Sequence, residues 1–391
     1  MILFEKAHDI VLKSANVIGT ETVNINTSLN RILAKDVYSD IDMPPFNKSA
    51  MDGFACRRKD IDEELEIIET IPAGKSPEKT ITQGKCARIM TGAIIPDGTD
   101  CVVIVENIEH IGDNIIKVIT HSNRNNISYK AEDIKTGALV LNKNTLIKPQ
   151  HIAIMATVGC TKPVVYKQPK VGVISTGSEL VEPDKKPGLS QIRNSNGSQI
   201  IAQIKNSFAI PVYYGIAEDS EEITFNTIKK ALSECNVVLL TGGVSMGDYD
   251  FVPDVLKRAN IKILFNQLAV QPGKPTTFGL NKNKIVFGLP GNPVSSFIQF
   301  ELLVKPLLFK TMGYNYNPVI IKLPMSTEYK RQSTKRKGII PVQITKEGTI
   351  SPNEYHGSAH INSLTFADGI IFIPIGKSSL KKGKIVDVQL L

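Results

Sequence analysis

The stretch KVGVIST, Lys170–Thr176, decides the fold class of this chain. It is an apolar run rich in β-branched residues, which is typical of a buried strand. The segment SNGSQIIAQIKNSF (195–208) follows with helical period, and Ser195 or Asn196 is expected as its N-cap. The next run, PVYYGIA (211–217), is again a strand. Strand–helix–strand order of this kind predicts a parallel sheet with helices on both faces.

The same alternation continues as far as residue 308. A helix capped by Asp219 and Ser220 comes next, and a last helix begins at Asn292 with Pro293 in its first turn. Three apolar runs between them predict strands: NVVLLTGG (236–243), IKILFN (261–266) and KIVFGLPG (284–291). We therefore expect an open α/β sheet in this part of the chain.

The segments on either side of this unit have a different rhythm. From 66 to 133, short β-branched runs alternate with Gly, Pro and Asn turns, which predicts a small β-rich domain. A connecting stretch then includes a helical segment, PQHIAIMATVG (149–159). Short strands return in the last part of the chain and indicate a C-terminal β domain: GIIPVQI (338–344), GIIFIPI (369–375) and KIVDVQL (384–390).

Length and composition exclude several classes of protein. With 391 residues, 42% of them apolar, the chain can form about two to four domains with real cores. No run approaches the roughly 18 apolar residues needed to span a bilayer. The N-terminal helical pattern carries Glu5 and Asp9, so it does not resemble a signal peptide. We expect a cytoplasmic protein without a membrane partner.

Cysteines, histidines and charge give weaker indications. The five cysteines include no C-x-x-C pair, so neither a disulfide framework nor a zinc site is expected. His356 and His360 are four residues apart, but Gly357 lies between them, which favours a loop over a metal site.

The net charge of +8 fits nucleic acid or small anionic ligands. The basic run 330–337 has no alternating aromatic residues, so we expect no nucleic-acid partner.

Ligands of open α/β sheets bind beyond the carboxyl ends of the strands. Three glycine-containing loops leave predicted strands there: STGSEL (175–180), LTGGVSMGDYD (240–250) and GLPGNPVSS (288–296). Free backbone N–H groups in such loops can cradle an anion, although glycine after a strand also serves simply to turn the chain. None of the loops is a Walker A motif or a Rossmann G-x-G-x-x-G motif.

Two of these loops also carry acids, namely Glu179, Asp248 and Asp250. A carboxylate repels a phosphate unless a cation lies between them, and Mg²⁺ takes carboxylate and phosphate oxygens together. A heterocycle with N–H donors is the other partner that a carboxylate accepts well. We therefore expect a ring system with an attached phosphate or nucleotide, together with a divalent ion. Lys274, in QPGKPTTFG (271–279), is either the nearby cation or a solvated turn lysine.

A second unusual stretch, IDMPPFNKSAMDGFA (41–55), lies far from these loops in the sequence. Its double proline holds the chain extended, and Asp52 stands directly before Gly53 within apolar neighbours. An Asx turn is the structural explanation for such an aspartate. The density of turn residues around it favours a functional role instead.

Seven motifs, in order along nearly the whole chain, resemble one known family: PPFNKSAMDGFA, ARIMTGAIIPDGTDCVVIVEN, AEDIKTG, VISTGSEL, TGGVSMGDYD, QPGKPTTFG and GLPGNPVSSF. This is the MoeA family of molybdopterin molybdenumtransferases, to which the E domain of eukaryotic gephyrin is related. The resemblance implies insertion of molybdate into adenylyl-molybdopterin, with release of AMP and formation of molybdenum cofactor. It also implies assistance by Mg²⁺, a homodimer, and contact with other molybdenum cofactor biosynthesis proteins.

The implied fold is a multidomain α/β protein with four parts. They are an elongated linking domain (1–45 and 134–168), a small β-rich domain (46–133), a Rossmann-like molybdopterin-binding domain (169–314) and a C-terminal β-barrel (315–391).

The resemblance and the loops together nominate the site. The expected catalytic residues are Asp52, Asp133, Glu179, Asp250 and Lys274. The expected metal ligands are Asp52, Glu179 and Asp250. The expected substrate-binding residues are Thr91, Gly92, Thr176, Gly177, Asp219, Gly242, Gly243, Ser245, Gly247, Pro272, Gly273, Pro290, Gly291, Asn292 and Ser295. Asp219 is also the expected helix cap.

The chain departs from the family pattern mainly where cations are common. Ser128 stands where the family often has Arg, and Gln267 and Gln271 stand where some members have Lys. Ala131 replaces a frequent Gly. These changes leave open which residues hold molybdate.

Two other functions compete with the transferase. One is a scaffold that binds molybdopterin or a nucleotide without turnover, because a Rossmann-like fold alone proves no chemistry. The other is the related molybdopterin adenylyltransferase, which shares only the α/β domain and which the long flanking segments disfavour.

Overall fold

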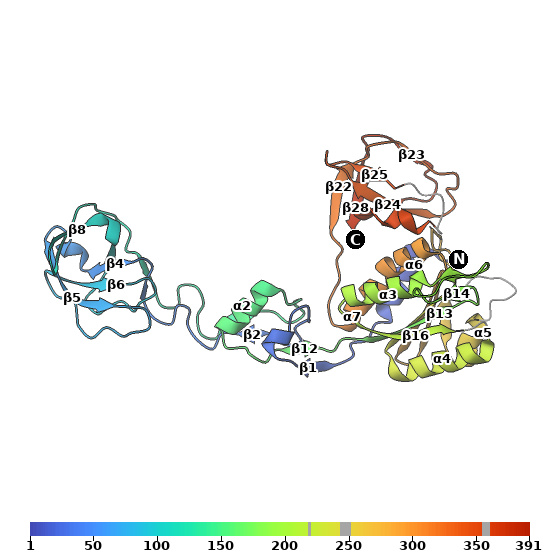
Figure 1. Cartoon of the computed structure of the whole chain (residues 1–391), viewed down its shortest axis with the longest axis horizontal. Helices are drawn as coiled ribbons and strands as arrows, with labels where there is room; N and C mark the ends of the chain where they lie inside the picture. Colours follow the sequence, from blue (N-terminus) through green and yellow to red (C-terminus); the bar gives the residue numbers. More distant parts are fainter. Residues whose placement is uncertain (218–219, 243–251, 354–359) are drawn as a thin grey trace.

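The computed structural model of the chain describes residues 1–217, 220–242, 252–353 and 360–391. The molecule is elongated (Figure 1). A small β-sheet unit lies at one end, a narrow arm follows, and the α/β unit and the C-terminal sheet lie together at the other end.

The α/β unit is built on a six-stranded sheet in the order β16-β13-β17-β21-β20-β18. Its strands are β13 (Lys170–Thr176), β16 (Ile210–Ala217), β17 (Val237–Thr241), β18 (Lys262–Phe265), β20 (Thr277–Asn281) and β21 (Lys284–Leu289). The first four in spatial order are parallel, whereas β20 and β18 are antiparallel to their neighbours. The prediction of a purely parallel sheet was wrong at this edge, because 277–281 forms a strand that turns tightly back into β21.

Helices cover both faces of this sheet, as the sequence predicted. They are α1 (Phe4–Lys13), α3 (Ser195–Asn206), α4 (Glu221–Glu234), α5 (Val252–Arg258), α6 (Pro293–Gln299), a π-helical turn (Phe300–Val304) and α7 (Lys305–Thr311). Helices α1, α3, α6 and α7 share one core with the sheet, and α4 and α5 share the other. Although residues 1–45 were assigned to the linking domain, α1 buries Ala7 and Val11 in the α/β core.

The N-caps of α3 and α4 and the first turn of α6 can be compared with the prediction. The cap of α3 is Asn194, whose Oδ1 accepts from the Gly197 N–H at 3.0 Å, so the prediction of Ser195 or Asn196 was wrong by one or two positions. Ser220 caps α4 as expected, and Pro293 occupies the first turn of α6.

The arm consists of an outgoing and a returning segment. Three short antiparallel pairs join them: β1 (Thr20–Thr22) with β12 (Val164–Tyr166), β2 (Val37–Tyr38) with β11 (Leu139–Leu141), and β3 (Lys48–Ser49) with β10 (Ile127–Ser128). The predicted helix is α2 (Pro149–Thr157), which packs Met155 against the buried Leu33 and Val165. The small β unit is therefore an insertion carried on a two-segment stalk.

The inserted unit is a six-stranded mixed sheet in the order β7-β4-β6-β5-β9-β8. Its strands are β4 (Gly53–Cys56), β5 (Glu64–Ile71), β6 (Lys85–Ile89), β7 (Cys101–Ile104), β8 (Ile108–Gly112) and β9 (Ile115–Val118). This agrees with the β-rich domain predicted there.

The C-terminal sheet has the order β19-β24-β26-β28-β22, with β25 paired to β24. Its strands are β19 (Val270–Gln271), β22 (Ile320–Pro324), β24 (Lys337–Ile344), β25 (Ile350–Pro352), β26 (Gly369–Ile373) and β28 (Ile385–Leu390). Strand β19 comes from the α/β unit and runs parallel to β24, so it ties the two units together just before Lys274. Among the described residues, no helix has the length and apolar character needed to cross a membrane.

Candidate functional site

The carboxyl ends of β13, β17 and β21 lie side by side, as they must in a parallel sheet. Thr176 ends β13 and its Oγ1 donates to the carbonyl oxygen of Thr241 at 3.4 Å. Thr241 ends β17 and its Oγ1 lies 3.5 Å from the carbonyl oxygen of Pro290, which follows β21. The predicted loops therefore start from one edge of the sheet, which we call the strand-end edge.

Asn196, in the first turn of α3, spans this edge. Its Nδ2 donates to Thr241 Oγ1 at 2.8 Å and to the Gly291 carbonyl oxygen at 2.7 Å. The residue is only 9% exposed, and within the described part of the chain its Oδ1 has no hydrogen-bond partner. A buried acceptor without a donor is uncommon in proteins, and here it can accept an N–H group of a ligand. Sequence reasoning considered Asn196 only as a cap.

A buried polar network fixes the loop below Asn196. Asn194 Nδ2 donates to Ser175 Oγ and to the Tyr213 hydroxyl, both at 2.9 Å. The Tyr213 hydroxyl in turn donates to Glu182 at 2.8 Å. Burial and the hydrogen bond to Glu182 raise the pKa of Tyr213 to about 12, so it remains a neutral donor at neutral pH. The network holds the start of α3 against the end of β13.

Glycine is required at two positions of the strand-end edge. Gly242 has φ +88°, and a Cβ on it would lie 2.2 Å from the Thr176 carbonyl oxygen. Gly177 has φ +141°, and a Cβ there would lie 2.4 Å from Glu179 Oε2. The Glu179 side chain therefore folds back over its own loop, while the residue stays exposed to solvent. Both glycines are thus required by the close packing of the protein's own atoms, and the Glu179 carboxylate is open to a ligand.

The loop with Lys274 packs onto α6. Gly273 has φ +101°, and a Cβ on it would lie 2.2 Å from Gln299 Nε2. Gln299 is fully buried and donates to the Pro272 carbonyl oxygen at 3.4 Å. Lys274 itself is exposed. At the start of α6, Asn292 is exposed and Ser295 is buried.

A second centre, the Asp52 turn, lies in the inserted unit. The Thr91 N–H and Thr91 Oγ1 both donate to Asp52 Oδ1, at 2.6 and 2.8 Å. These two bonds, with the Arg88 guanidinium nearby, lower the pKa of the Asp52 carboxyl below its ordinary value. Gly92 follows with φ +85°. The turn thus presents an ionised, exposed carboxylate whose second oxygen accepts no described hydrogen bond.

Comparison with known proteins agrees with this arrangement. Three family models match successive parts of the chain: MoeA N-terminal region (domain I and II) at 2–159, probable molybdopterin binding domain at 172–310, and MoeA C-terminal region (domain IV) at 323–391. A molybdopterin molybdenumtransferase of Staphylococcus epidermidis is 39% identical, over 97% of this chain and 93% of its own length. The chain belongs to the MoeA family.

Other MoeA relatives extend the comparison. A molybdopterin molybdenumtransferase of Staphylococcus aureus is 36% identical, over 94% of this chain and 90% of its own length. The crystal structure of a molybdopterin biosynthesis MoeA protein from Pyrococcus horikoshii is 31% identical, has a TM-score of 0.85, and is covered completely in both directions. The multidomain fold described above is therefore that of the MoeA family.

This MoeA chain does not bring its two centres together by itself. Asp52 directly precedes β4 at one end of the molecule, whereas Glu179 follows β13 at the other (Figure 1). Asp133 is exposed at the foot of the inserted unit, where its N–H donates to the Met43 carbonyl oxygen at 3.0 Å. Among the described residues, no group of three or more His, Cys, Asp or Glu side chains could hold a metal ion. Several predicted site residues lie outside the described residues: Asp219, Gly243, Ser245, Gly247, Asp248 and Asp250.

The departures from the family pattern have clear places in the fold. Ser128 pairs with Lys48 where the stalk enters the inserted unit. Ala131 has φ +61°, a conformation that favours the glycine frequent in the family. Gln271 lies in β19, beside the C-terminal sheet. Arg88, which sequence reasoning did not single out, is the cation beside Asp52.

A pocket of about 560 Å³ lies at the opposite, amino-terminal end of the central strands. Lys284, the first residue of β21, contributes to its wall, as do Arg258 and Asn281. None of the predicted site residues that the structure describes lines it, so it is separate from the strand-end edge.

Proposed function

We propose that this MoeA-family chain is a molybdopterin molybdenumtransferase, which inserts molybdate into adenylyl-molybdopterin and releases AMP in the cytoplasm. The observation that carries this proposal is the strand-end edge. There, Asn196 offers a buried acceptor for a ring N–H, and the glycine turns that follow the strands would offer backbone N–H groups to phosphate. A pterin joined through pyrophosphate to adenosine has both kinds of group.

The residues at this edge orient the pyrophosphate for displacement at phosphorus. Gly177 and Gly242 allow the tight turns after β13 and β17, and the Asn194 network keeps the backbone at the start of α3 fixed. The exposed Lys274 would supply a positive charge to the phosphate groups. Orientation of this kind contributes to rate because the reacting groups need no further ordering.

Mg²⁺ fits the donors that the two centres present. The exposed Glu179 carboxylate and the open second oxygen of Asp52 are the hard oxygen ligands that this ion prefers. When bound, Mg²⁺ would neutralise charge on the phosphate oxygens. The Asp52 turn contributes a carboxylate that stays ionised at neutral pH, and Arg88 beside it is a candidate partner for molybdate.

Separation of the centres supports a homodimer with composite sites. Because Asp52 and Glu179 lie at opposite ends of one elongated chain, a common site requires the inserted unit of one subunit to meet the strand-end edge of the other. A two-fold axis would then produce two identical sites.

Release of AMP tests the proposed reaction directly. The purified protein should release AMP from adenylyl-molybdopterin when molybdate and Mg²⁺ are present, and much less when molybdate is omitted. Binding of adenylyl-molybdopterin without AMP release would identify a scaffold. Formation of adenylyl-molybdopterin from ATP and molybdopterin would identify an adenylyltransferase instead.

A further inference from the structure

Two thiols face each other in the core of the inserted unit. Cys56 ends β4 and Cys101 begins β7, and the two residues are directly opposite in the antiparallel register. Their sulfur atoms are 3.6 Å apart, and the Cys101 thiol also lies 3.6 Å from the Cys56 carbonyl oxygen. Directly opposed residues of antiparallel strands have Cα separations of about 4.5–5.5 Å, within the range that a disulfide bridges.

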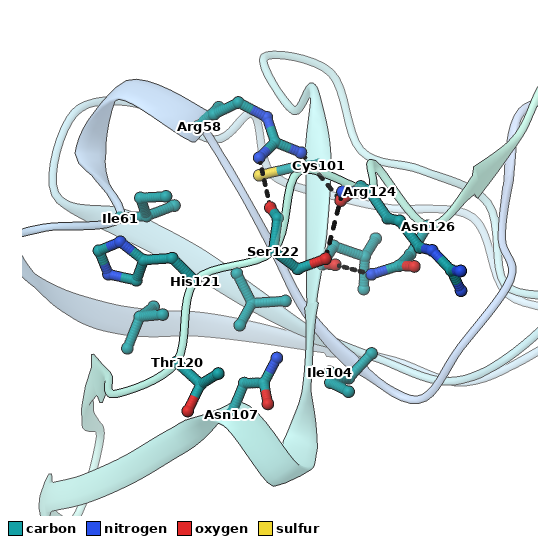
Figure 2. Close-up of a pocket in the computed structure, with 13 residues that line it drawn as sticks. Arg58, Ile61, Cys101, Ile104, Asn107, Thr120, His121, Ser122, Arg124 and Asn126 are labelled. Atoms are coloured by element: carbon teal, nitrogen blue, oxygen red, sulfur yellow. Dashed lines mark hydrogen bonds between the residues drawn. The ribbon is translucent and has the colours of Figure 1, made fainter.

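Cys101 lines a small pocket that Figure 2 shows in close-up. The volume open to a water-sized molecule is about 10 Å³, which is enough for one such molecule. The Cys101 sulfur lies beside the Arg58 guanidinium in this view. Arg58 is held in place because it donates to the carbonyl oxygens of Ser122 and Arg124 at 2.8 and 2.9 Å. The pocket is therefore the approach to one of the two sulfurs, and a fixed positive charge lies beside it.

The environment distinguishes the two thiols. The hydrogen bond from Cys56 and the positive charge of Arg58 lower the pKa of the Cys101 thiol despite its burial. The hydrogen bond with Cys101 and burial raise the pKa of the Cys56 thiol. Because Cys101 lines the pocket and lies beside Arg58, it is the thiol placed to react first, and Cys56 is placed to resolve the product.

We propose that Cys101 and Cys56 are a peroxide-oxidised dithiol, a modification site that is independent of the transferase reaction. The Cys101 thiolate attacks one oxygen of hydrogen peroxide, the O–O bond breaks, and a sulfenic acid and one water form. The Cys56 thiol then attacks the Cys101 sulfur, a second water leaves, and the S–S bond forms. The dithiol loses two electrons and two hydrogens, and the peroxide is reduced to two waters.

The Cys56–Cys101 disulfide would join β4 and β7, the two strands that hold the Asp52 turn. Gly53, next to Asp52, pairs with Ile104 on β7, and the Val105 N–H donates to the Asp52 carbonyl oxygen at 3.3 Å. Oxidation at the other end of this strand pair therefore fixes the spacing of the strands from which Asp52 projects.

A third thiol in the same core provides a matched control. Cys86, on β6, belongs to the same buried cluster, and burial raises its pKa to about 12. It makes no described sulfur hydrogen bond to Cys56, unlike Cys101. Cys160 in the arm is only half-buried, so its oxidation shows how readily a more accessible thiol reacts with the peroxide.

Peptide mapping of the folded, full-length protein after hydrogen peroxide treatment tests the proposal. We expect a loss of about 2 Da, a Cys56–Cys101 cross-linked peptide, and recovery of both thiols after reduction. Cys86→Ala should keep the link, Cys56→Ala should leave Cys101 as a sulfenic acid that dimedone traps, and Arg58→Gln should slow the reaction. The unsubstituted protein gives the decisive map even if a cysteine variant does not fold. Oxidation of Cys160 with Cys101 unchanged, or a link from Cys56 to Cys86, would overturn the proposal.

Discussion

The strand-end edge and the Asp52 turn present carboxylates in two different ways. At the strand-end edge, Glu179 belongs to a loop that a buried network and two obligatory glycines hold in place. In the inserted unit, Asp52 is an exposed side chain oriented by one residue, Thr91, through two hydrogen bonds. The first centre is fixed by the topology of a parallel sheet, and the second by a single turn.

This difference has a consequence for how the two centres work together. A rigid edge suits the recognition of a large substrate, because its donors and acceptors need no reorganisation on binding. A turn at the end of a stalk suits a group that arrives with a second subunit. The stalk joins its two segments by three short strand pairs and by further backbone hydrogen bonds, such as that from the Ser39 N–H to the Ala138 carbonyl oxygen at 2.9 Å, so it holds the turn away from the α/β unit.

The largest effect is expected from neutralising the carboxylate of the rigid edge. Glu179→Gln keeps the size and shape of the side chain but is a poor ligand for Mg²⁺, so AMP release should fall about 100-fold or more. Glu182→Gln is the matched control, because Glu182 already accepts the Tyr213 hydroxyl and an amide oxygen can replace it there. Equal activity of the two variants, with an unchanged Mg²⁺ requirement, would remove Glu179 from the metal site.

Subunit mixing tests whether the two centres form one site. Inactive Asp52→Asn and inactive Glu179→Gln proteins are mixed under conditions that exchange subunits. If sites are shared between chains, about half of the dimers are mixed, and each has one site with neither lesion, so about a quarter of the original AMP release should return. No recovery after verified exchange would place the two residues in one subunit's site or in separate sites. Asp52→Asn mixed with itself is the control.

The sequence predicted those features of the fold that follow from a local pattern of residues. The strand ends of the α/β unit share an edge because parallel strands must, so the contacts of Thr241 with Thr176 and Pro290 followed from the strand–helix order. The role of Asn196 did not follow, because its contact with Gly291 links residues 95 positions apart. The antiparallel strand β20 was missed because TTFG reads equally well as a loop after Lys274.

The distance between the two centres was also not predictable from local pattern. It depends on pairs such as Thr20 with Tyr166, which join segments of three residues each, too short to show a strand period. The motif at Asp52 was recognisable, and its partner Thr91 was nominated separately. Only the fold shows that the two side chains are hydrogen-bonded and that both lie far from Glu179.

A smaller effect is expected from loosening the Asp52 turn. Thr91→Val removes one of two hydrogen bonds that stabilise the ionised carboxylate, so the Asp52 pKa should rise toward its ordinary value. Activity should then fall a few-fold on the acid side of the pH profile and stay unchanged above it. Thr136→Val is a close control, because Thr136 makes the same two bonds to Asp42, at 2.9 Å each, in the arm. If Thr91→Val and Thr136→Val lose activity equally on the acid side of the pH profile, the effect is not local to Asp52.

The smallest effect is expected at Lys274, the exposed cation of the rigid edge. If its charge attracts the substrate phosphate, Lys274→Ala should weaken binding by about 0.2–1 kcal/mol at low salt, which is up to about fivefold in Kd. The loss should shrink at high salt, because ions screen an exposed charge. Lys262→Ala, at the opposite end of the sheet, removes the same charge away from the edge and should change Kd little at either salt concentration. A loss for Lys274→Ala that is equal at both concentrations would show that this lysine supports the loop structure and does not attract the substrate.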